Sequence, residues 1–163
     1  MTGTRILIAL SLFGFLSACG GPGENAEIPE AQPASASSAD IGDYTVHFSA
    51  QSTDQLPPQI ASAYNIVRSK NRAMLTVSII RMSDNLSVHA DVTVKTVNMT
   101  EQLKNVTLRL IEEPGTDGAP GAIYYVGVTP VANREMLKFD ISVTPEGVDK
   151  ESRVRFIRQF FTD

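Results

Sequence analysis

Three cations at alternate positions are the residues of this sequence whose types and spacing best suit ligand binding. Arg68, Lys70 and Arg72 stand at i, i+2 and i+4, with Ser69 and Asn71 between them. In an extended chain alternate side chains share one face, so the three charges would form a row. Such a row can hold a carboxylate or phosphate of a peptide terminus, a peptidoglycan stem or a lipid headgroup. The commoner role is structural, because most surface cations cap helices or pair with nearby acids and contribute little energy.

No other combination of residues predicts a catalytic centre, a metal site or a cofactor. His47 and His89 fall on the polar positions of predicted strands, with no cysteine or carboxylate cluster beside them. Glu112 and Glu113 are adjacent, so on a strand they point to opposite faces. The sequence has no Gly-x-Ser-x-Gly elbow, phosphate-binding glycine loop or His-Glu-x-x-His motif. We therefore favour a non-catalytic protein, and keep an enzyme with an unfamiliar site as the alternative.

The single cysteine, Cys19, ends a short apolar run near the start of the chain. The run at 6–15 follows a basic residue and is shorter than the roughly 20 residues of a membrane-spanning helix, so it predicts a signal peptide. Residues 16–19 (Leu-Ser-Ala-Cys) resemble the lipobox of bacterial lipoproteins. That resemblance implies a signal peptide at 1–18, cleavage before Cys19 and its lipidation, so that the membrane is one partner. Gly20 favours, by the same resemblance, the outer membrane over the inner one; an ordinary signal with an incidental cysteine is the alternative.

A second segment separates Cys19 from the rest of the chain. Residues 20–42 are rich in Gly, Pro, Ala and Ser and contain no aromatic residue, so we predict a lipidated cysteine and disordered tether at 19–42. The chain has 163 residues and a formal net charge of −4, and much of the acidic excess lies in this tether. The remaining domain, 43–163, is nearly neutral, which argues against nucleic acid as a partner.

The elements that position these residues follow from a hydrophobic period of two beyond residue 42. Alternating runs predict strands at 44–48, 73–79, 86–94, 105–110, 124–128, 137–143 and 153–160. Residues 56–64 contain two prolines followed by helix-tolerant residues, which predicts one short helix between the first two strands. About seven strands in one domain predict an all-β fold, an antiparallel immunoglobulin-like β-sandwich, with a small open β-barrel as the alternative.

Two details of the strand pattern concern the surface. Arg158 shares the phase of the apolar residues Phe156 and Phe160, which predicts a bulge or a buried ion pair near the end of the last strand. Tyr124 and the residue after it must point to opposite faces of their strand, so one ring is expected in the core and one outside. The outer ring, together with Phe161, would suit a partner-binding surface.

A longer segment carries a family resemblance. Residues 64–73 read YNIVRSKNRA, and shorter supporting segments stand at 122–125, 139–145 and 159–163. With them the domain resembles a family of short exported proteobacterial proteins that is catalogued as a domain of unknown function. Many relatives carry an ordinary cleavable signal, so the lipobox and tether are a departure. The resemblance implies export and supplies no activity.

Together these patterns predict a lipid-anchored β-sandwich in the bacterial cell envelope that faces the periplasm and binds an envelope protein or peptidoglycan. Binding would use the segment from Arg68 to Arg72 or an unpaired sheet edge. An envelope enzyme and a structural or chaperone-like accessory are the other two hypotheses.

Overall fold

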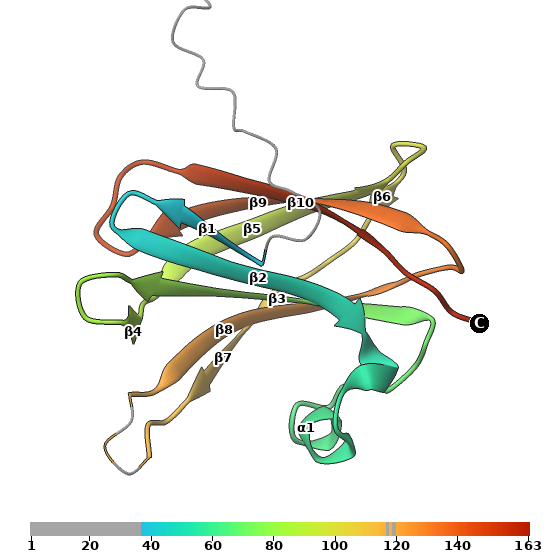
Figure 1. Ribbon diagram of the computed structural model, residues 1–163, viewed down its shortest axis with the longest axis horizontal. Helices are drawn as coiled ribbons and strands as arrows, with labels where there is room; N and C mark the ends of the chain where they lie inside the picture. Colours follow the sequence, from blue (N-terminus) through green and yellow to red (C-terminus); the bar gives the residue numbers. More distant parts are fainter. Residues whose placement is uncertain (1–36, 117, 119) are drawn as a thin grey trace, which may run out of the picture.

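The computed structural model describes residues 37–116, 118 and 120–163, which form two antiparallel sheets packed face to face (Figure 1). The first sheet has the order β1-β2-β3-β8-β7, with β4 paired to β3, and the second has the order β10-β9-β5-β6. The first sheet comprises β1 (Ser38–Ile41), β2 (Tyr44–Ser52), β3 (Arg72–Arg81), β4 (Leu86–Ser87), β7 (Arg109–Glu113) and β8 (Ala122–Pro130). The second comprises β5 (Ala90–Asn98), β6 (Leu103–Lys104), β9 (Met136–Pro145) and β10 (Ser152–Gln159). The predicted signal peptide and Cys19 lie outside the described residues.

The order of the long strands identifies the fold class. Seven of the described strands have five or more residues, and they run β2-β3-β8-β7 in one sheet and β10-β9-β5 in the other. Constant-type immunoglobulin domains pair their seven strands in the same order, ABED in one sheet and GFC in the other. The predicted antiparallel sandwich is therefore confirmed, and its sheets do not close into the small barrel that was the alternative.

The main core lies between the two sheets and follows the predicted alternation. The ring of Phe156 on β10 stacks against both Phe48 on β2 and Phe139 on β9, with ring centroids 4.8 Å apart in each pair. These three rings join the two sheets, because β2 belongs to one and β9 and β10 belong to the other. Burial of such large apolar side chains stabilises each by about 1.5–3 kcal/mol.

A second cluster covers the outer face of the first sheet. The 3₁₀-helix η1 (Thr53–Gln55) and the helix α1 (Pro58–Ala63) follow β2, which confirms the predicted helix. Ala61 of α1 packs with Met74 of β3 and Val126 of β8. The expectation that one of the two rings at Tyr124 and Tyr125 lies outside, as part of a partner surface, is wrong: Tyr125 lies in the main core and Tyr124 packs against this second cluster. The partner of Tyr124 was invisible in the strand pattern because α1 precedes it by some sixty positions in the sequence.

Two strand boundaries differ from the prediction because the chain changes sheets there. The run at 86–94 is divided into β4 and β5, which belong to different sheets, so its unbroken alternation spans a crossover. At 105–108 there is no strand, although Val106 packs against the main core. That segment passes close to Gly127 of β8, where a Cβ would lie 2.5 Å from a methyl carbon of Val106. A glycine is therefore required for the segment to approach the sheet.

The predicted tether extends too far toward the domain. Residues 38–41 form β1 and pair with β2, where Ser38 lies opposite His47 and Ile41 opposite Tyr44. Ala39 and Ile41 also pack against the main core. The ordered domain thus begins earlier than residue 43, because two apolar side chains and a strand edge are enough to order a segment of tether-like composition.

Candidate functional site

The segment at 65–71, which contains most of the predicted cation row, is a loop fastened to η1. Thr53 is fully buried, and its hydroxyl accepts a hydrogen bond from the Ser69 N–H at 2.9 Å. The same hydroxyl lies 2.9 Å from the carbonyl oxygen of Val67 and 3.1 Å from that of Ser69, to which it can donate. Arg68 donates to the main-chain oxygen of Asp54 at 2.6 Å. The buried hydroxyl of Thr53 and the side chain of Arg68 therefore hold the loop against η1.

The three predicted cations contact different parts of the molecule. Lys70 donates to the main-chain oxygen of Asp163, whereas Arg68 is held at η1. Asn71 accepts a hydrogen bond from the Val131 N–H through its main-chain oxygen at 2.9 Å. Arg72, the first residue of β3, makes no hydrogen bond or ion pair through its side chain within the described part of the chain. The expected extended row is absent because residues 68–71 are not in a strand, and Arg68 and Lys70 serve as links between segments.

This loop belongs to one end of the sandwich, which we call the distal end. It is the end where β2, β5, β8 and β10 finish and where β3 and β9 begin (Figure 1). Among the residues that the structure describes, the four most exposed large hydrophobic side chains all lie there, at 62–67% exposure: Val67, Met99, Leu103 and Phe161. Exposed apolar side chains grouped on one part of a soluble surface mark interaction sites more often than scattered ones do.

A groove of about 550 Å³ opens at the distal end between the two sheets. Its described lining comes from the end of β2, from η1, from the start of β9, from β10 and from the two residues after β10: Gln51, Ser52, Gln55, Met136, Ile157, Arg158, Gln159, Phe160 and Phe161. Arg158 is the ionisable side chain among these residues, and it is exposed. The predicted bulge or buried ion pair at Arg158 is wrong, because the β10–β9 ladder runs on regularly to Gln159 opposite Met136. The side chain of Arg158 is on the same side of β10 as that of Phe156, but it lies at the end of the core, where it lines the groove.

Sequence reasoning found Arg158 and Phe161 but not the groove that they share. Arg158 stood out in the sequence because it is a charged residue at a position where the alternation of the strand predicts a buried apolar side chain. Gln51 and Gln55 gave no signal, since they precede β10 by about a hundred positions and approach it only through the packing of the two sheets.

Glu135, the residue before the groove-lining Met136, connects several segments of the chain at the distal end. Its carboxylate pairs with Lys104 at 2.7 Å and accepts a hydrogen bond from the Ala132 N–H at 2.8 Å. Burial opposes ionisation of Glu135, but the hydrogen bonds from Lys104, the Ala132 N–H and Asn98, with the charge of Lys104, lower its pKa. The main-chain oxygen of Glu135 accepts the Phe160 N–H at 2.9 Å, so this residue connects β6, the β8–β9 loop and the end of β10.

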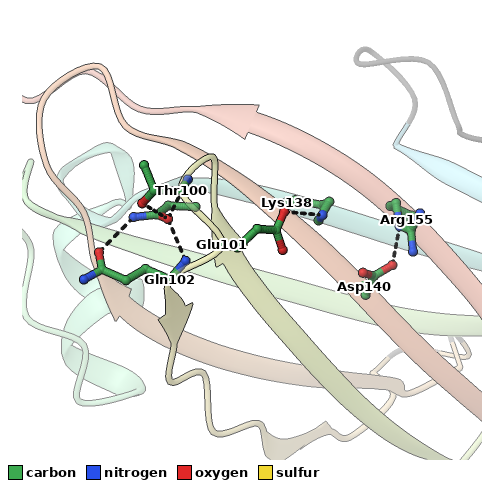
Figure 2. Close-up of polar contacts among 7 residues, drawn as sticks. Thr100, Glu101, Gln102, Lys138, Asp140 and Arg155 are labelled. Carbon is green, nitrogen blue, oxygen red and sulfur yellow. Dashed lines mark hydrogen bonds and ion pairs between the residues drawn. The ribbon is translucent and has the colours of Figure 1, made fainter.

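The outer face of the second sheet carries charges that are paired with one another (Figure 2). Lys138 pairs with Glu101 at 3.1 Å, and Arg155 donates to Asp140. That hydrogen bond and the charge of Asp140 raise the pKa of Arg155. Arg153 likewise pairs with Glu151, at 2.9 Å. Of the three arginines on β10, Arg158 alone has no ion pair within the described residues.

The two histidines do not assemble a reactive site. His89 lies 3.1 Å from the carboxylate of Glu112, and both side chains are about half exposed. His47 is exposed on β2 and lies outside the groove, whereas His89 lies between β4 and β5. The described residues contain no group of three or more His, Cys, Asp or Glu side chains placed to hold a metal ion. Within the same residues, no helix has the length and apolar character needed to cross a membrane.

Comparison with known proteins places the domain in a family. The family model described as "Domain of unknown function (DUF4426)" matches residues 38–163. The crystal structure of a DUF4426 family protein from Pseudomonas aeruginosa is similar to this chain, with 28% sequence identity and a TM-score of 0.64. The alignment covers 77% of this chain and 94% of that one.

Two further results add no functional information. A family 123 glycoside hydrolase from Clostridium perfringens aligns with a TM-score of 0.32 and 9% identity, over 71% of this chain and 27% of that one. This similarity is too low to support an argument about fold or function. No curated protein matches the sequence.

Proposed function

The chain belongs to the DUF4426 family, a domain of unknown function, and we propose that it is a non-catalytic binding module anchored by lipid on Cys19. The module faces the periplasm from the outer membrane and binds an envelope protein at its distal end. The observation that carries the binding role is the groove, with Phe161, at 62% exposure, beside it. Exposed aromatic and aliphatic side chains together with an arginine are enriched in protein–protein interfaces, which favours a protein as the partner.

The composition of the groove favours binding over catalysis. General acid–base and nucleophilic chemistry need a reactive side chain and a second group that activates it. Among the described residues that line the groove, Arg158 is ionisable and the others are amides, an alcohol and apolar side chains. An arginine beside apolar side chains is a common anchor in protein interfaces.

The lipid anchor rests on the lipobox at 16–19, where the cysteine is also the single one of the chain. Several acyl chains hold a protein at a membrane far more firmly than one, because each buried methylene contributes about 0.8 kcal/mol. We expect metabolic labelling of the wild-type protein by a fatty acid and no labelling of the Cys19→Ser variant. Equal labelling of the two proteins, or no labelling of the wild type, would remove the lipid from the proposal.

The binding role is tested by photocrosslinking in living cells. A photoreactive phenylalanine derivative replaces Phe161 beside the groove or, as the control, Met82, which is 42% exposed at the opposite end of the sandwich. We expect one saturable protein adduct from position 161 and none from position 82. Adducts of equal yield from the two positions, or none from either, would contradict the proposed binding site.

A further inference from the structure

We propose that the partner docks as an extended strand along the outer edge of β10 and places a carboxylate side chain opposite Arg158. This inference rests on the proposed function and specifies how the distal end binds. Its basis is the combination of an open strand edge, a groove beside that edge and one cation without an ion pair.

The outer edge of β10 offers main-chain hydrogen-bonding groups. β10 is the last strand of its sheet, with β9 on one side and no described strand on the other. The Phe160 N–H bonds to Glu135 on the β9 side, and in an antiparallel pair this direction alternates along the strand. The N–H and C=O groups of Arg155, Ile157 and Gln159 therefore face the open edge. An added strand satisfies such a row of donors and acceptors, as in many peptide-binding domains.

The groove accepts one set of side chains of the added strand. Because side chains alternate between faces, half of those on the new strand point toward the space between the sheets. At the distal end that space is the groove, where Ser52 of β2 lies across from Arg158 and Phe160. The other half lie on the outer face beside Ile157, which is 38% exposed, and near Phe161. The site thus selects a strand with apolar outer residues and polar or acidic residues facing the groove.

Charge argues for an acidic strand and against a second copy of this chain. Arg153 and Arg155 are compensated by Glu151 and Asp140, which leaves Arg158 as the charge of β10 available to a ligand. β10 has no acidic residue, so edge-to-edge pairing of two copies would add arginines along one seam. Like charges across a strand pair are destabilising, whereas an acidic residue facing Arg158 gains a charge-assisted hydrogen bond.

The test uses random linear dodecapeptides displayed on phage and selected against the detergent-solubilised full chain. The enriched peptides are synthesised, and their affinities are measured by fluorescence anisotropy for the wild type and three variants. Ile157→Pro removes an N–H that faces the outer edge and leaves the hydrogen bonds to β9 in place. Strands tolerate proline at such edge positions. Ile157→Thr keeps that N–H and is the matched control. Arg158→Gln removes the charge.

We expect enriched peptides to contain Asp or Glu within an alternating apolar pattern. Their affinity should fall about tenfold or more for Ile157→Pro, about fivefold for Arg158→Gln and less than threefold for Ile157→Thr. The amide protons of Arg155 and Ile157 in the wild type should exchange more slowly in the complex, a readout that does not depend on the folding of any variant. Absence of enriched peptides, equal affinity for Ile157→Pro, or unchanged exchange at these amides would overturn the strand mode.

The two proposals fail separately. A protein adduct from position 161 together with unchanged exchange on β10 would retain the binding module and exclude strand addition. Absence of an adduct from position 161 would instead contradict the binding site itself.

Discussion

The hydroxyl of Tyr125 bridges the two sheets, and its removal gives a sharp test of how the sandwich is held together. Tyr125 lies on β8 of the first sheet with 8% of its surface exposed. Its hydroxyl donates to the main-chain oxygen of Ala90 at 2.7 Å and accepts the N–H of the same residue at 2.8 Å. Ala90 begins β5, so this pair of hydrogen bonds fixes the point where the chain enters the second sheet. We therefore choose Tyr125→Phe, which keeps the ring and removes only the oxygen.

The expected loss follows from the two hydrogen bonds. Each neutral intramolecular bond contributes about 0.5–1.5 kcal/mol net, so Tyr125→Phe should lower the free energy of unfolding by about 1–3 kcal/mol. The loss should fall toward the upper part of this range because both main-chain groups of the half-buried Ala90 lose their partner. In a domain of this size each kcal/mol corresponds to roughly 3–5 °C in Tm, which gives a decrease of about 3–15 °C.

The assay is urea unfolding followed by circular dichroism, with a thermal melt as a second measurement. Tyr124→Phe is the matched control, because the neighbouring hydroxyl makes no hydrogen bond within the described residues. We expect the control to remain within about 0.5 kcal/mol of the wild type. Equal losses for the two variants, or a loss below 0.5 kcal/mol for Tyr125→Phe, would refute the bridge as a source of stability.

Three further substitutions test other contacts by the same unfolding assay. Gly127→Ala should destabilise the protein by about 1–3 kcal/mol, because its Cβ would lie 2.5 Å from Val106, and a stable variant would show that the 105–108 segment can move aside. Thr53→Val should cost about 1–3 kcal/mol and increase proteolysis within 65–71, since the loop loses its buried hydroxyl; intact protection would contradict that role. Glu135→Gln should cost about 1–3 kcal/mol at pH 7 through loss of the Lys104 pair. The folded-state pKa of Glu135 lies below its ordinary value of 4.5, so this contribution is present above pH 4.5 and is lost as the pH falls through the lowered pKa. The free energies of unfolding of the wild type and Glu135→Gln should therefore converge in acid. A difference that stays constant with pH would contradict the role of the ionised carboxylate.

The fold was predictable because the strands alternate so regularly. Alternating apolar residues predict which face of a strand is buried, as with Val46 and Phe48 on β2 and Leu137 and Phe139 on β9. The structure buries all four. Phase is a local property, so it does not report a change of sheet. The run at 86–94 kept its alternation across the crossover at Ala90 for this reason.

The distal end was only partly predictable, because it is made by residues far apart in the sequence. The cations at 68–72 were visible as a pattern, but their contacts depend on Thr53, on Asp54 and on the main-chain oxygen of Asp163. Arg158 stood out by its phase, yet its position in a groove depends on the packing of β2 against β10. Local periodicity therefore identified the unusual residue and could not supply its surroundings.

The central claim, that the edge of β10 at the distal end is the binding surface, is tested most directly by hydrogen–deuterium exchange and mass spectrometry. The full chain is measured in membranes from the cells that produce it, where the proposed partner would be retained, and after purification in detergent. We expect slower exchange of peptides covering 152–161 in the membranes, with unchanged exchange at 82–89 at the opposite end. Equal exchange of 152–161 in the two samples, or slowing confined to 82–89, would contradict it.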